Sequence, residues 1–205
     1  MKTINSWLTL LFLLFASTKK LKFAIASGVH DTDGSMVENG GDYYILPSLK
    51  GEGGGGVTLA SIGVTHPLAI VQSPVNSLGL PVSISNINGT MIILTDDILS
   101  INFTNSSHCN NSCTWMLVMD DSAKVWYLGI GSAVDYPSHQ IKMGRFQIKE
   151  FNLDYKLVFC SDSNTPSCED VGIYIDSGKN RRLALSGAAF SVRLKNADKY
   201  PAAFD

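Results

Sequence analysis

The sequence predicts an all-β domain, built as a barrel or a sandwich. From residue 43 onward, short apolar or alternating runs follow one another about every 8–15 residues and are separated by turn residues. The 18 glycines and seven prolines supply many turns. No window shows the 3.6-residue period of an amphipathic helix, so we expect helices to be short or absent.

Twelve strands are expected, and several alternate cleanly. In the last one, Phe190, Val192 and Leu194 share one face, which would be buried. No composition shift marks a linker, so the strands should form one domain. The expected strands cover residues 43–49, 57–62, 67–72, 91–95, 98–103, 115–119, 125–130, 145–151, 155–159, 171–175, 182–186 and 189–194.

Residues 1–26 have the pattern of a secretory signal peptide. Lys2 gives the positive start, residues 7–16 form an apolar run too short to span a membrane, and residues 24–26 offer small side chains for cleavage. The mature domain would then be residues 27–205. We expect it to follow the secretory route, to the cell exterior or the vacuole, with no membrane attachment after cleavage.

The charge balance argues against nucleic acid as a partner. Without residues 1–26 the chain keeps 12 basic and 18 acidic side chains, a formal net charge of −6. Nucleic-acid binding needs a basic face. The small basic clusters at 179–182 and 193–199 are typical of a solvated surface.

Four cysteines and four glycosylation sequons fit an oxidising compartment. An even cysteine count there indicates two disulfides with three possible pairings, and the spacings do not match a zinc site. The cysteines are Cys109, Cys113, Cys160 and Cys168. The asparagines of the N-x-S/T sequons, expected to carry glycans on an exposed side, are Asn88, Asn102, Asn105 and Asn110.

Motifs for catalysis, cofactors or metals fail on inspection. Residues 51–56 match G-x-G-x-x-G, but a strand rather than a helix should follow, so no pyrophosphate site is expected. Residues 31–42 begin like a calcium loop but lack its glycine and its final glutamate. Hydrolase signatures are absent and the four histidines are scattered. We therefore expect no enzyme activity, no cofactor and no metal.

One stretch near the start of the expected mature domain matches a pattern of fixed residues at fixed spacing. Residues 29–45 fit the pattern aliphatic-x-D-x-x-G-x-x-aliphatic-x5-Y-x-aliphatic, from Val29 through Asp31, Gly34 and Val37 to Tyr43. Further along the chain, other segments resemble segments of the same family: "HPLAIVQSP", "YKLVFC" and "CEDVGIYID". The chain thus resembles the plant Kunitz soybean-trypsin-inhibitor family over about residues 29–195, a range set by these motifs.

This resemblance implies a pseudo-threefold β-trefoil of twelve strands, with a six-stranded barrel and a cap of hairpins. It also implies a secreted, monomeric plant defence protein that inhibits an endopeptidase, most often of the serine class. Inhibition in the family is substrate-like: a stiff exposed loop enters the protease cleft, and its P1 side chain fills the primary pocket, S1.

Gap-free comparison with the family places the reactive loop on Asn86, Ile87, Asn88, Gly89, Thr90 and Met91. P1 then falls on Gly89, give or take one residue, and P1′ on Thr90. Trypsin needs a basic P1 side chain, because a carboxylate lies in its S1 pocket. No Lys or Arg occurs between Lys50 and Lys124, and a glycan on Asn88 would obstruct docking. We therefore expect no trypsin inhibition through this loop.

The resemblance also implies a supporting residue and one disulfide. Asn39 matches the asparagine that braces the reactive loop, although an ordinary turn before two glycines would also explain it. Cys160–Cys168 matches the family's second bridge. The partner position of the first bridge is His66, so Cys109 should pair with Cys113 or stay free.

Two functions remain open from the sequence. The first is a protease inhibitor of altered specificity, acting through this loop or through another at residues 161–167 or 135–144, which holds Lys142. The second is a non-inhibitory binding or storage protein on the same scaffold, because fold does not fix function.

Overall fold

The computed structural model describes residues 26–48, 54–61, 68–104, 112–161 and 167–201. Strands dominate these ranges, and their one helical element is a single 3-10 turn, η1 (Ala133–Asp135). Within the same residues, no helix has the length and hydrophobicity needed to cross a bilayer. The expected signal peptide and its cleavage site lie almost wholly outside the described residues.

Six antiparallel strands form a closed barrel. Each pairs with the next in the order β10, β14, β1, β4, β5 and β9, and β9 closes the ring by pairing with β10 along eight residues. The edge strand β11 (Cys168–Asp170) adds to β10. The barrel strands are β1 (Asp42–Pro47), β4 (Val82–Asn86), β5 (Leu99–Phe103), β9 (Gly144–Phe151), β10 (Asp154–Ser161) and β14 (Ser191–Asn196).

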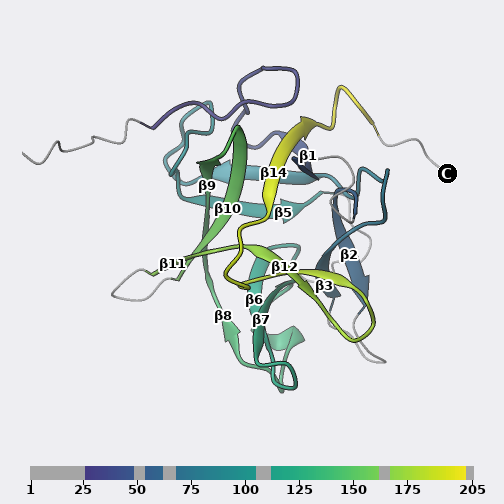
Figure 1. Ribbon diagram of the computed structural model, residues 1–205. Coiled ribbons are helices and arrows are strands. Elements are labelled where there is room, and N and C mark those ends of the chain that lie inside the picture. The colour runs from purple at the N-terminus through teal and green to yellow at the C-terminus, as the bar shows by residue number, and fades with distance from the viewer. Residues whose placement is uncertain (1–25, 49–53, 62–67, 105–111, 162–166, 202–205) are drawn as a thin grey trace, which may run out of the picture.

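Three hairpins cap one end of the barrel (Figure 1). One strand of each hairpin, β3, β7 or β13, pairs with the corresponding strands of the other two, which places three equivalent strands around one axis. A closed barrel with a threefold hairpin cap is a β-trefoil, so the expected fold is confirmed. The cap strands are β2 (Val57–Ser61), β3 (Leu68–Gln72), β6 (Trp115–Asp120), β7 (Val125–Ile130), β12 (Gly172–Ile175) and β13 (Arg181–Ala184), with the short β8 (Ile141–Lys142) beside β6.

Inward side chains of the barrel and the cap merge into one core. In β4 and β5 every second residue is buried, as a two-residue period requires. At the junction with the cap, Trp115 lies against Phe103 and Phe146, with ring centroids 5.5 and 5.7 Å apart. The barrel interior is therefore filled by side chains, so residues that could bind a partner lie on the loops.

One predicted strand is absent, and the strand before it was missed. Residues 91–95 are apolar enough for a strand, but they form only isolated bridges, Ile92 with Glu38 and Leu94 with Gly28. The strand that precedes them, β4, was not predicted, because its sequence "VSISN" has only two apolar residues and its third inward position is Asn86. The short strands β8 and β11 were also missed.

A buried ion cluster joins two cap hairpins. Arg182 in β13 donates from Nε to Asp176 at 2.6 Å and from Nη1 to Asp120, in β6, at 3.0 Å. Burial alone would raise the pKa of Asp176, but hydrogen bonds from Asn180 and Arg182 outweigh it and hold that pKa below its usual value. The pKa of Asp120 is lowered in the same way, against its own burial, by Ser122, Ala123 and Arg182.

Candidate functional site

The candidate site is the connection between β4 and β5, which we call the β4–β5 turn (residues 87–91 with the base residues 92–98). Its base is closed by Ile87, whose N–H donates to the carbonyl oxygen of Ile98 at 3.2 Å. Residues 87–91 are all exposed, with Ile87 59% and Met91 87% accessible. Gly89 is thus held outside the sheet rather than paired within it.

Asn86 is the centre of this turn rather than one of its contact residues. Its side chain is only 8% exposed and lies inside the turn. The Oδ1 atom accepts the N–H of Gly89 at 2.9 Å, and Nδ2 donates to the hydroxyl of Thr90 and to the carbonyl oxygen of Ile92. The sequence placed Asn86 among the residues presented to a partner, and the structure corrects this. A buried amide that both donates and accepts can close a turn that apolar residues could not.

Asn39 lies directly beside Asn86. Its Oδ1 accepts the backbone N–H of Asn86 at 2.9 Å, its Nδ2 faces Asn86 Oδ1 at 3.3 Å, and its own N–H donates to the carbonyl oxygen of Met91 at 2.9 Å. The preceding residue is tied down as well, because Glu38 donates its N–H to the Tyr43 hydroxyl. Burial raises the pKa of that hydroxyl. Asn39 therefore sits where a loop-supporting residue must be, and its role in function stays a prediction.

Asp97, together with Asn39 and Asn86, forms the hydrogen-bonded brace of the turn, and the sequence alone did not identify it. Its Oδ2 accepts the N–H of Leu94 at 2.9 Å and faces Asn86 Nδ2 at 3.4 Å, while Oδ1 faces Asn88 Nδ2 at 3.4 Å. In the sequence, the adjacent pair Asp96-Asp97 is typical of a turn and carries no further signal. No local signal shows which of two adjacent carboxylates faces inward, since that depends on the strand on which the turn closes.

The backbone at Gly89 differs from an extended substrate. Its φ is +69°, in the left-handed region that favours glycine, and an added Cβ would meet nothing within 4 Å. Its N–H is already bound to Asn86. A peptide in a protease cleft is extended and offers its N–H groups to the enzyme. The turn would have to open at Gly89 before this position could serve as P1.

The sequons differ in accessibility. Asn88 is exposed at the tip of the turn, whereas Asn102 is half-buried in β5, opposite Ser83 of β4 and bridged to Thr114. Asn105 and Asn110 lie outside the described residues. Among the described sequons, Asn88 therefore leaves the most room for a glycan.

The expected disulfide Cys160–Cys168 is present and joins β10 to β11, with 4.1 Å between the Cα atoms. Cys113 also belongs to a disulfide. Cys109, its expected partner, lies outside the described residues.

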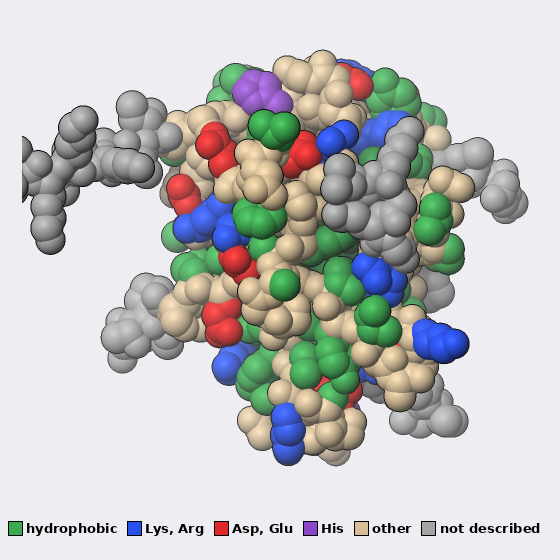
Figure 2. Space-filling view, in the orientation of Figure 1, with side chains coloured by type: hydrophobic (Ala, Val, Ile, Leu, Met, Phe, Trp, Pro, Cys, Tyr) green, Lys and Arg blue, Asp and Glu red, His purple; other side chains and the backbone are tan. Residues whose placement is uncertain are grey.

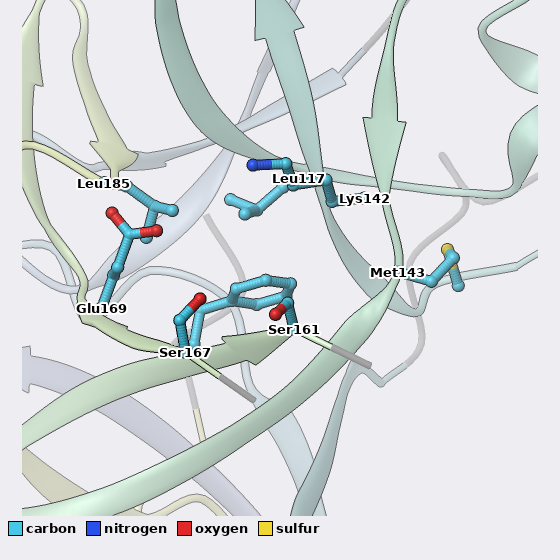
Figure 3. Close-up of a pocket in the computed structure, with 8 residues that line it drawn as sticks. Leu117, Lys142, Met143, Ser161, Ser167, Glu169 and Leu185 are labelled. Atoms are coloured by element: carbon cyan, nitrogen blue, oxygen red, sulfur yellow. The ribbon is translucent and has the colours of Figure 1, made fainter. Parts of the chain in front are cut away.

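The two alternative binding loops, residues 135–144 and 161–167, show less evidence of a binding site. Lys142 is not on a projecting loop but in β8, paired with Leu117 of β6, and its Nζ lies 4.2 Å from the centre of the Trp126 ring. Of residues 161–167, only the two ends are described. They border a cavity of about 400 Å³ between barrel and cap, which is also lined by Leu117, Lys142, Glu169 and Leu185 (Figure 3).

The described part of the chain shows no metal centre and no concentrated basic patch on the face that is drawn. No group of three or more His, Cys, Asp or Glu side chains there is placed to hold a metal ion. On the face drawn in Figure 2, the described Lys and Arg side chains are interspersed with Asp and Glu rather than gathered into one patch. The β4–β5 turn remains the feature that the scaffold presents most distinctly.

Comparison with known proteins decides the family. Residues 29–196 match the legume-type Kunitz family, described as "Trypsin and protease inhibitor". The chain belongs to this family. Its members are protease inhibitors and not enzymes, so the Kunitz scaffold accounts for the absence of a catalytic constellation in the sequence.

Similar Kunitz proteins align with 77–96% of this chain. A Kunitz-type trypsin inhibitor-like 2 protein from Pisum sativum is 35% identical over 96% of this chain and 95% of its own. A subtilisin inhibitor, CLSI-II, from Canavalia lineata is 32% identical over 77% of this chain and 85% of its own. The crystal structure of a Kunitz-type trypsin inhibitor from Cicer arietinum superimposes with a TM-score of 0.78 at 34% identity, covering 83% of this chain and 99% of that one.

Replacing Asn86 with alanine should loosen the turn. Gly89 N–H and the Asn39 amide lose their shared partner, so we expect the free energy of unfolding to fall by about 1–3 kcal/mol. Cleavage between residues 87 and 91 by a nonspecific protease should become faster, as mapped by mass spectrometry. Ser85→Ala, on the outward face of the same strand, is the control, and equal stability and cleavage for both variants would show that Asn86 does not hold the turn.

Proposed function

We propose that this Kunitz protein inhibits a serine endopeptidase through the β4–β5 turn, and that trypsin is not its target. The observation that carries the proposal is the turn itself. It exposes only uncharged side chains, from Ile87 to Met91, on a backbone braced by Asn39, Asn86 and Asp97.

A braced turn favours inhibition because little freedom remains to be lost on binding. Ordering a loop costs about 0.5–1.5 kcal/mol for each immobilised side chain, and pre-ordering avoids part of this cost. Asn86 alone makes hydrogen bonds to four other residues of the turn region, Gly89, Thr90, Ile92 and Asp97. The contact surface is therefore ordered before a partner arrives.

The absence of a basic residue sets the specificity. A trypsin-like S1 pocket contains a carboxylate that needs a cation, whereas apolar S1 pockets, as in chymotrypsin, accept uncharged side chains. No Lys or Arg lies between Lys50 and Lys124. The Canavalia lineata relative, named a subtilisin inhibitor, supports an apolar specificity on this scaffold.

The proposal includes secretion as a monomer after removal of residues 1–26. The disulfide Cys160–Cys168 supports an oxidising compartment. A plant defence role, at the cell exterior or in the vacuole, follows from this route and from the resemblance.

A non-inhibitory binding or storage protein is the second candidate, and one observation favours it. The Gly89 N–H is bound to Asn86 and the Gly89 φ is positive, so the turn is closed where a substrate would be extended. A glycan on Asn88 would add to this obstruction.

An inhibition panel separates the two candidates. The secreted, natively glycosylated protein is titrated against trypsin, chymotrypsin, subtilisin, a papain-like protease and an aspartic protease, with the Asn88→Gln variant in parallel. We expect inhibition of subtilisin or chymotrypsin and none of trypsin. If neither the wild type nor Asn88→Gln inhibits any of the five proteases, the second candidate is favoured. If the protein inhibits trypsin at nanomolar concentration and an Asn88/Gly89 double variant abolishes this inhibition, the first candidate is overturned.

A further inference from the structure

Met91 is the most exposed large apolar residue of the β4–β5 turn. Its side chain is 87% accessible, against 59% for Ile87 and 39% for Ile98. Single exposed apolar residues are common and need no explanation by themselves. Met91 differs from such residues because hydrogen bonds hold the backbone on which it lies.

The backbone around Met91 is fixed on three sides. The Met91 carbonyl oxygen accepts the Asn39 N–H at 2.9 Å, and the next residue, Ile92, bridges to Glu38. The Ile92 carbonyl oxygen also accepts the hydroxyl of Thr90 at 3.0 Å. The Met91 side chain thus projects into solvent from a backbone with little freedom, the arrangement of an anchor that a partner pocket can receive.

The same contacts show that Met91 would not act as a substrate residue. A scissile carbonyl must point into the oxyanion hole of the protease, and that of Met91 is bound to Asn39. Gly89, the position aligned with P1, has no side chain to offer and its N–H is bound inside the turn. Recognition then rests on the Met91 side chain rather than on a presented peptide bond.

We propose that Met91 is the anchor by which this protein binds its target, entering an apolar pocket at the edge of the protease cleft, and that oxidation of its thioether switches binding off. This rests on the proposed function. Methionine suits such a pocket because its unbranched, polarizable side chain adapts to irregular apolar walls.

The switch has simple chemistry. Hydrogen peroxide transfers one oxygen atom to the Met91 sulfur: the peroxide O–O bond breaks, a sulfur–oxygen bond forms, and water leaves. The sulfur loses two electrons and the peroxide gains them. The product, a sulfoxide, is polar and chiral, so it no longer suits an apolar pocket.

Substitution tests the anchor. With the protease that the wild-type protein inhibits in the panel, subtilisin or chymotrypsin, Met91→Gln should raise the dissociation constant about tenfold to a hundredfold, because a buried apolar side chain is replaced by a polar one of similar length. Met91→Leu should stay within about threefold, because an apolar side chain of similar volume is kept. Met91 is exposed in the free protein, so the thermal unfolding midpoints of both variants should equal that of the wild type.

Peroxide tests the switch. Wild-type protein treated with hydrogen peroxide until Met91 is fully oxidised by peptide mass spectrometry should bind as weakly as Met91→Gln. Met91→Leu should keep its affinity under the same treatment, although Met36 and Met143, 45% and 49% exposed, are oxidised in both proteins. Those two methionines are therefore an internal control for oxidation elsewhere.

The outcomes separate the two proposals. If the wild type inhibits a protease and Met91→Gln inhibits it equally well, the anchor is refuted while the proposed function stands. If Met91→Gln weakens inhibition but the oxidised wild type does not, only the switch is refuted. If neither glycosylated nor Asn88→Gln protein inhibits any protease of the panel, the proposed function fails, and the anchor with it.

Discussion

Replacing Arg182 with methionine is expected to lower the free energy of unfolding by about 3–5 kcal/mol near neutral pH. The guanidinium is the shared partner of Asp120 and Asp176, whose side chains are 19% and 6% exposed. Without it, the Asp120 and Asp176 carboxylates would lose the cation that both of them contact. Urea unfolding followed by circular dichroism measures the loss.

Lys124→Met is the matched control. Lys124 pairs with Asp121 at 3.7 Å, but the two side chains are 76% and 55% exposed. Exposed pairs contribute about 0–1 kcal/mol, so this variant should unfold close to the wild type. A similar loss in both variants would mean that the Arg182 cluster contributes no more than a surface ion pair.

The stabilisation by Arg182 should also depend on pH. Because the pKa values of Asp120 and Asp176 are lowered in the folded protein, their contribution is full above the unfolded value of about 3.9 and is lost as the pH falls through the folded values. The difference between wild type and Arg182→Met should therefore be largest near pH 7 and should shrink below about pH 4. A difference that stays constant from neutral to acid pH would contradict this account.

Replacing Trp115 with alanine is expected to cost about 3–5 kcal/mol of stability. Its side chain is 1% exposed and lies between Phe103 and Phe146 at the junction of barrel and cap. The surrounding strands are held by their pairing and cannot collapse into the space left behind. Urea titration with far-ultraviolet circular dichroism measures the effect without relying on tryptophan fluorescence.

Trp115→Phe should lower the free energy of unfolding by much less than half of the loss expected for Trp115→Ala. Phenylalanine keeps an aromatic ring between the two neighbours, and it removes the indole Nε1, which is buried and has no hydrogen-bond partner among the described residues. If phenylalanine costs as much as alanine, the ring contacts are not what Trp115 contributes.

Most strands were predictable because their signal is local. Runs such as 125–130 and 155–159 combine β-branched or aromatic residues with flanking turns, and they became β7 and β10. Strand β4 was not, because Asn86 interrupts its apolar alternation. The apolar residues 91–95 were misassigned because Ile93 is buried by contact with the segment around Val29 and Val37, more than fifty residues away in the sequence, and not by a sheet.

The candidate site was predictable in position but not in construction. The resemblance located the turn at residues 86–91 and Asn39 beside it. It did not show that Asn86 turns inward, that Asp97 joins the brace, or that Gly89 adopts a positive φ. Each of these depends on how two strands end next to a third segment, which no local pattern encodes.

The amino-acid sequence by itself determined the all-β class, the Kunitz family and the absence of a basic residue at the turn, since composition, spacing and residue identity are properties of the chain alone. Only the tertiary structure decided which atoms of the turn are free to meet a partner. Closure of the barrel brings Asn39 and Asn86 together, and their hydrogen bonds then occupy the Gly89 N–H and the Met91 carbonyl oxygen and leave the Met91 side chain in solvent.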